Sequence, residues 1–125
     1  MNIKSIDHLV LTVADIATTV KFYENVLGMQ RVISPEGRVA LKFGNQKLNL
    51  HQKGKEFEPK AEHPTPGAID ICFITDEPIE QVKAELESKN ISTQGLFERS
   101  GATGKIRSVY FRDPDMNLIE VSNYI

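Results

Sequence analysis

Apolar and polar positions along the chain form short runs, and two of these runs are each followed by a stretch with helical spacing. The run "IDHLVLTV" at 6–13 is short and rich in Val, Leu and Thr, which predicts a strand. In the following "ADIATTVKFYENVLGM", apolar residues recur every three or four positions, which predicts a helix. Asp15 suits the N-cap of this helix and Gly28 its C-cap.

The next segment, "QRVISPEGRVALKFGNQKLNLHQ", predicts three short strands separated by the turn signals "PEG" and "GNQ". After a polar, proline-containing loop at 55–65, the same order begins again. "AIDICFIT" predicts a strand, and "DEPIEQVKAELESKN" predicts a helix with Asp76 near its cap and Pro78 in its first turn. Three further strands are predicted near "ISTQGLFE", at "KIRSVYFRD" and at "NLIEVSN".

The predicted order is therefore βαβββ, loop, βαβββ, an internal repeat with modules at about 1–54 and 66–125. Hairpins join the strands of each triplet, so the predicted fold class is α+β. Neither half could easily bury its sheet alone. We therefore expect one domain, 1–125, in which two tandem modules form a cupped mixed sheet around a metal-binding cleft.

Composition narrows the class of protein. The 125 residues are 40% apolar and 26% charged, which is typical of one compact, soluble domain. A formal charge of −2 and the lack of a long basic run argue against a nucleic-acid partner. No segment approaches the roughly 20 apolar residues that a membrane span needs, and the N-terminus makes a poor signal peptide. With Cys72 as the single cysteine, these features predict a cytoplasmic protein without an internal disulfide.

Four polar side chains interrupt predicted strands at positions where apolar residues are expected: His8, His51, Asp70 and Glu120. Charged residues are seldom fully buried unless they are paired or bind a metal. Taken singly, His51 fits an exposed edge and Asp70 a strand start. Taken together, His8 from the first strand and Glu120 from the last contribute one side chain from each module. Imidazole nitrogen with carboxylate oxygen suits a divalent transition metal that keeps open positions for substrate.

The opening "IDHLVLTVADIATTVKFYENVLGM" resembles the start of the vicinal oxygen chelate superfamily, and "YFRDPDMNLIEV" resembles its closing motif. This superfamily includes glyoxalase, fosfomycin-resistance, bleomycin-resistance and extradiol dioxygenase proteins. The segments "GNQKLNLHQKGKEFEPKAEHPTPGAIDICFIT" and "RSGATGKIRSVYFRDPD" resemble its glyoxalase-domain-containing subgroup. The resemblance covers nearly the whole chain and is more specific for the fold than for the reaction, because the superfamily hosts many chemistries.

The resemblance implies a divalent metal ion (Zn, Ni, Mn or Fe) held at four strand positions, which here carry His8, His51, Asp70 and Glu120. The third of these positions usually carries His in the family, and this chain has Asp70 there. Aligning His8 with Asp70 directs Asp70 toward the site, and the apolar pattern favours this register. A slip of one residue would turn Asp70 to the other face of its strand. In that case His51 would complete the set with His8 and Glu120.

The run "SVYFRDPD" resembles the equivalent part of fosfomycin thiol transferases, where such residues contact an anionic substrate. The resemblance therefore implies Arg99, Ser108 and Tyr110 as substrate-binding residues. Ser108 and Tyr110 share a face if their strand is regular, and a purely structural role for both is an equal alternative.

We expect a metal-dependent glyoxalase-like enzyme that chelates a small oxygenated substrate through two neighbouring oxygens, with lyase, isomerase or dioxygenase-type chemistry. Glu120 or Asp70 would move the proton. The resemblance also implies a homodimer whose sites take ligands from both chains. One alternative is a metal-free binding protein of the bleomycin-resistance type, which needs an aromatic-lined cavity that a chain without Trp does not favour. Another is a fosfomycin-type thiol transferase with the same metal ligands.

Overall fold

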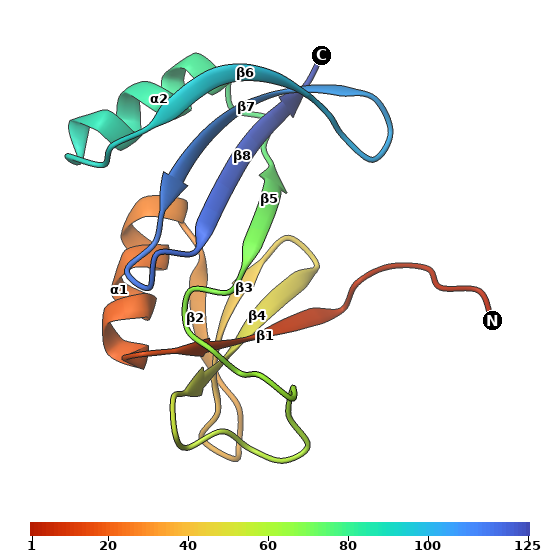
Figure 1. Cartoon of the computed structure of the whole chain (residues 1–125), viewed down its shortest axis with the longest axis vertical. Helices are drawn as coiled ribbons and strands as arrows, with labels where there is room; N and C mark the ends of the chain where they lie inside the picture. Colours follow the sequence, from red (N-terminus) through yellow and green to blue (C-terminus); the bar gives the residue numbers. More distant parts are fainter. The chain divides into compact units, whose positions relative to one another are not determined.

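Two compact units, Met1–Gly67 and Ala68–Ile125, make up the computed structural model, which describes all residues 1–125. Each unit has the order βαβββ and its own four-stranded mixed sheet (Figure 1). The α+β fold of two βαβββ modules is therefore confirmed. Residues 53–69, which join the last strand of the first unit to the first strand of the second, contain no helix or strand.

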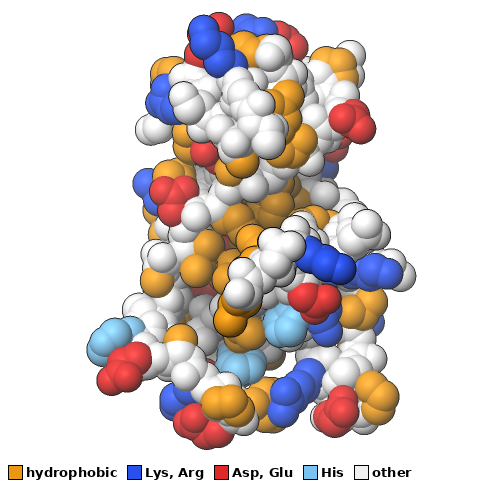
Figure 2. All heavy atoms as spheres, turned by 90° about the vertical axis from the view of Figure 1, so that its right-hand side faces the viewer, with side chains coloured by type: hydrophobic (Ala, Val, Ile, Leu, Met, Phe, Trp, Pro, Cys, Tyr) orange, Lys and Arg blue, Asp and Glu red, His pale blue; other side chains and the backbone are white.

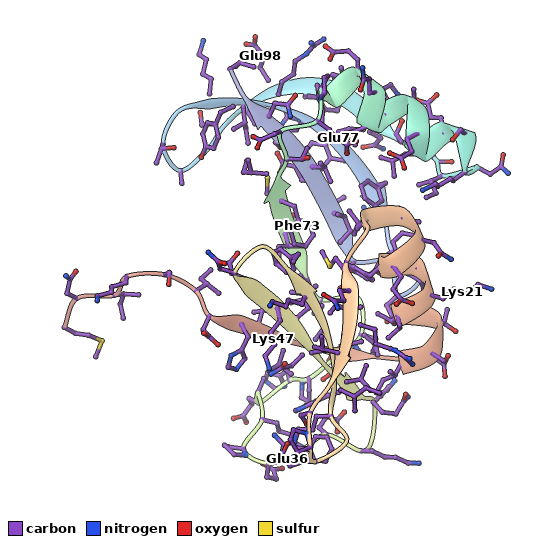
Figure 3. The ribbon with its side chains drawn as sticks, turned by 180° about the vertical axis from the view of Figure 1, so that it is seen from behind. Lys21, Glu36, Lys47, Phe73, Glu77 and Glu98 are labelled. Carbon is purple, nitrogen blue, oxygen red and sulfur yellow. The ribbon has the colours of Figure 1, made fainter.

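The first unit builds its sheet in the order β1-β4-β3-β2, with β1 parallel to β4 and the other pairs antiparallel. Its helix packs against this sheet through Val20 and Tyr23, which are buried, whereas Lys21 points outward from the helix (Figure 3). The elements are β1 His8–Val13, α1 Ile16–Leu27, β2 Gln30–Ile33, β3 Val39–Phe43 and β4 Gln46–Gln52.

The second unit repeats this arrangement in the order β5-β8-β7-β6, with β5 parallel to β8. Its helix buries Ile79 and Leu86 and contacts β7 and β8, whose buried residues on alternate positions include Val109 and Val121. One face of the sheet is thus covered by the helix, and the other carries the polar side chains considered below. The elements are β5 Asp70–Ile74, α2 Ile79–Ser88, β6 Gln94–Ser100, β7 Lys105–Arg112 and β8 Leu118–Tyr124.

The two helices begin in different ways. Asp15 caps α1 by accepting a hydrogen bond of 2.9 Å from the amide of Thr18, and Gly28 ends the helix at φ 66°, both as predicted. For α2 the start differs by one residue from the prediction: Asp76 does lie near the cap, but Pro78 is itself the N-cap and not part of the first turn. Neither helix combines the length and apolar character that crossing a membrane requires.

Candidate functional site

The two units can be aligned through one pair of side chains at the ends of β4 and β8. Gln52 accepts a hydrogen bond of 3.1 Å from the amide of Ile16, the first residue of α1. Asn123 accepts one of 2.8 Å from the amide of Ile79, the first residue of α2. Because Gln52 and Asn123 make the same contact in each unit, they occupy equivalent positions.

Strand pairing gives the same alignment. Val10 lies opposite Asn49 in the first unit, and Cys72 lies opposite Glu120 in the second. Both units therefore show the register that aligns the first residue of β1 with the first residue of β5. The equivalent positions in the two units are His8 and Asp70, Asn49 and Glu120, and His51 and Ser122.

Glu120 lies in the middle strand of three on the polar face of the second unit. Cys72 on β5 and Tyr110 on β7 are its direct cross-strand neighbours. These side chains line a cavity of about 410 Å³ together with Arg99, Ile74 and residues of the β6–β7 hairpin. The cavity therefore combines a carboxylate, a phenol and a guanidinium with apolar walls.

Two serines contact the same oxygen, Oε2, of the Glu120 carboxylate. Ser108 donates a hydrogen bond of 2.5 Å to its Oε2, and Ser122 Oγ lies 3.3 Å from the same oxygen. Ser108 and Ser122 are both fully buried at 0% exposure, whereas Glu120 is half-buried. Neither serine hydrogen-bonds to Oε1.

Arg99 and Tyr110 form the opposite side of this cavity. Arg99 Nε donates a hydrogen bond of 3.2 Å to the Tyr110 hydroxyl, and its guanidinium lies 4.7 Å from the centre of the Phe97 ring. Burial is the main cause that raises the pKa of Tyr110; the hydrogen bond from Arg99 opposes it, and the charge of Glu120 adds to it. A hydrogen bond with the Glu120 carboxylate also raises this pKa, so the phenol stays protonated at neutral pH with its hydroxyl between Arg99 and Glu120.

The first unit has a smaller cavity of about 180 Å³, which His8, Asn49 and His51 line. His8 Nδ1 lies 2.8 Å from a carboxylate oxygen of Asp7, whereas His51 is 8% exposed and meets the Phe57 ring edge-to-face at 5.5 Å. Figure 2 shows histidine side chains on the surface of this unit with charged side chains beside them.

The remaining candidates lie outside the two cavities. Asp70 is exposed at the start of β5, on the same sheet face as Glu120. Ser108 lies beneath Glu120 and does not line the cavity. The period of two along "NLIEVSN" places Ser122 on the face of Glu120, but the sequence did not identify it as a site residue. It also missed Asn49 as the equivalent of Glu120, because that equivalence depends on the strand register.

The imidazole nitrogen of His8 and the carboxylate oxygens of Glu120 are of the kinds that bind divalent cations. Neither unit by itself gathers three His, Cys, Asp or Glu side chains around one point. The contact of His8 Nδ1 with Asp7 places a proton on Nδ1 and leaves Nε2 as the nitrogen that can bind a metal, and carboxylates orient metal-binding histidines in this way. Glu120 likewise has one oxygen held and the other free of serine contacts. The fit therefore rests on the chemistry of the individual donors.

A family model provides the decisive comparison. The model described as the Glyoxalase/Bleomycin resistance protein/Dioxygenase superfamily matches residues 5–121. The chain belongs to this superfamily. The resemblance found in the opening and closing motifs is thereby confirmed.

Relatives of this superfamily member include virulence protein STM3117 of Salmonella typhimurium, which is 58% identical over 100% of this chain and 88% of that protein. The crystal structure of STM3117 matches with a TM-score of 0.98 over 100% of both chains. Glyoxalase domain-containing protein RDO1 of Mycosarcoma maydis is 50% identical over 99% of this chain and 70% of that protein. The crystal structure of lactoylglutathione lyase from Agrobacterium tumefaciens is 26% identical, with a TM-score of 0.74 over 98% of this chain and 96% of that one.

Proposed function

We propose that this superfamily member is a metal-dependent, glyoxalase-like enzyme that acts on a small oxygenated substrate. The observation that carries the proposal is the carboxylate of Glu120, which lies in a 410 Å³ cavity with Oε2 held by a buried serine. Because Oε1 has no serine contact, the carboxylate is suited to bind a cation or accept a proton. Membership of the superfamily and the likeness to a lactoylglutathione lyase support this reading.

The proposed metal ligands are His8 and Glu120, with either Asp70 or His51 as the third. The equivalence of Asp70 with His8 supports Asp70, because both open the first strand of their unit on the polar face. His51 has Ser122 as its equivalent, and it lies under Phe57. A bound divalent ion would supply Lewis-acid stabilisation of negative charge on the oxygens of the substrate.

The chain's own groups then have distinct tasks. Glu120, or Asp70 on the same sheet face, would accept the proton that leaves the substrate. The Tyr110 phenol would donate a hydrogen bond to a substrate oxygen, and the cation of Arg99 would attract a negatively charged group. The apolar wall formed by Ile74 and Ile106 would keep water from part of the cavity.

The test is metal analysis of protein purified without chelator. We expect about one divalent ion per chain, and loss of that ion in His8→Ala and in Glu120→Ala. His63→Ala and Glu98→Ala are matched controls, because both side chains are exposed and lie outside the two cavities. Stoichiometric metal in both His8→Ala and Glu120→Ala would refute the proposal. Thermal stabilisation by an organic ligand with no response to metals would favour a metal-free binding protein instead.

We also propose that the active form is a homodimer whose sites use ligands from both chains, since His8 and Glu120 belong to different units. Size-exclusion chromatography with light scattering gives the mass directly. A monomer that still binds metal would contradict shared sites.

A further inference from the structure

Two buried serines face each other across β7 and β8. Ser108 and Ser122 are direct cross-strand partners, their Oγ atoms are 2.6 Å apart, and both side chains are fully buried. Buried hydroxyl groups need hydrogen-bond partners. The remaining partners of this pair are Glu120 on one side and Cys72, whose Sγ lies 3.3 Å from Ser122 Oγ, on the other.

Counting protons fixes the direction of these bonds. Each serine hydroxyl has one proton to donate, and an ionised carboxylate can only accept. Three oxygen–oxygen contacts join Ser108, Ser122 and Glu120, at 2.5, 2.6 and 3.3 Å. The two protons belong in the two short contacts, so Ser108 donates to Glu120 Oε2 and Ser122 donates to Ser108.

The same reasoning extends the chain to the thiol. Because the proton of Ser122 is used on Ser108, Ser122 Oγ is left to accept in its 3.3 Å contact with the Cys72 thiol, which also lies 3.9 Å from the carbonyl oxygen of Phe73. The hydrogen bonds thus run in one direction, from Cys72 through Ser122 and Ser108 to Glu120. Bonds aligned in this way polarise one another.

We propose that Ser108 and Ser122 are positioning residues that fix Oε2 of Glu120 and thereby present Oε1 to a bound divalent cation. The inference rests on the proposed function for the cation, but the hydrogen-bond chain exists without it. Ser108 therefore acts through Glu120 and not by touching substrate. Outer partners of this kind orient a ligand, and their loss weakens metal binding about 10- to 100-fold in other sites.

The first experiment measures affinity for Zn²⁺ by competition with a chromophoric chelator. We expect Ser108→Ala to weaken binding about tenfold and Ser122→Ala to weaken it less, because Ser122 acts through Ser108. Val109→Ala is the matched control, since Val109 is the next residue on β7, equally buried and on the opposite face. It should lower stability without changing affinity. Unchanged affinity in Ser108→Ala, or a larger loss in Ser122→Ala than in Ser108→Ala, would overturn the proposal.

The second experiment separates the serine chain from the metal. In metal-free protein, a double-mutant cycle of Ser108→Ala and Glu120→Ala in urea unfolding should show coupling of about threefold or more in the unfolding constant. Additive effects would overturn the positioning role. Clear coupling in a protein that binds no Zn²⁺ would instead refute the proposed function, and the positioning of Glu120 would stand.

Discussion

Gln52 and Asn123 make the same contact in the two units, since each accepts a hydrogen bond from the first amide of the helix in its own unit. Each side chain also donates to the chain just before that helix: Gln52 to the carbonyl of Ala14, and Asn123 to the carbonyls of Thr75 and Glu77. The last strand of each unit thus fixes the loop between the first strand and the helix. The two repeats therefore share this side-chain interaction as well as their topology.

Asn123→Ala should lower the free energy of unfolding by about 1–3 kcal/mol, because it leaves the amide of Ile79 and two carbonyls without their partner. The second unit depends on Asn123 because α2 has no side-chain cap of its own. Urea unfolding of the purified variant measures the change. Gln81→Ala, an exposed position on α2, is the control and should change stability by less than about 0.5 kcal/mol. Equal effects of the two substitutions would contradict this role.

This contact also marks the limit of what the sequence could predict. The sequence predicts Asp15 and Gly28 as caps because both are adjacent in sequence to the ends of their helix. The order of all ten elements followed from local periodicity for the same reason. Asn123 is 44 residues from the amide that it binds, and no local pattern reports such a contact.

The same distinction holds for the candidate site. Placing Ser108 and Tyr110 on one strand face needs only the period of two along β7, and the pairing of β7 with β8 shows both on the face of Glu120. Ser108 is buried beneath Glu120 and does not line the cavity. This position depends on the register between β7 and β8, which the pattern of apolar and polar residues does not predict. The equivalence of His8 with Asp70 likewise depends on the pairing of β1 with β4 and of β5 with β8, which only the structure shows.

The third ligand of the proposed metal site can be tested by comparing two variants, at Asp70 and at His51. We expect Asp70→Asn to weaken Zn²⁺ binding about tenfold or more and His51→Gln to change it by less than about threefold. The reason is that Asp70 is equivalent to His8, whereas His51 packs against Phe57. Chelator competition gives both affinities in one assay. The reverse order of effects would make His51 the third ligand.

Gly95 allows the chain to pass close to the backbone of Ser108. A Cβ atom at Gly95 would lie 2.6 Å from the carbonyl oxygen of Ser108, and φ there is +119°. Gly95→Ala should therefore cost more than the roughly 1–2 kcal/mol of an unfavourable φ alone. Gly44→Ala provides that reference, because φ is +50° there and the space around it is open. Thermal unfolding of both variants should show the larger loss for Gly95→Ala; a larger loss for Gly44→Ala would contradict this reasoning.

Alkylation kinetics can test the state of the Cys72 thiol. Cys72 is exposed at the cavity, and partial burial of its thiol is the main cause that raises its pKa; the hydrogen bond with Ser122 lowers the pKa, and the charge of Glu120 raises it further. A raised pKa means less thiolate at any given pH, so iodoacetamide should react more slowly with folded than with urea-unfolded protein at about pH 8. Glu120→Gln removes the neighbouring charge and should speed the reaction of the folded protein. Equal rates for the folded and unfolded protein would show that the thiol is not held in this way.

Mixing two inactive variants distinguishes a site within one chain from a site shared between chains. If each metal takes His8 from one chain and Glu120 from the other, a heterodimer of His8→Ala with Glu120→Ala has one intact site and one site that lacks both ligands. Random pairing after joint refolding makes about half of the dimers mixed, so about a quarter of the wild-type metal should return. Two different affinity tags on the variants confirm that mixed dimers have formed. If those dimers hold no metal although wild-type protein does, the two ligands do not meet across a dimer, and the shared-site proposal is wrong.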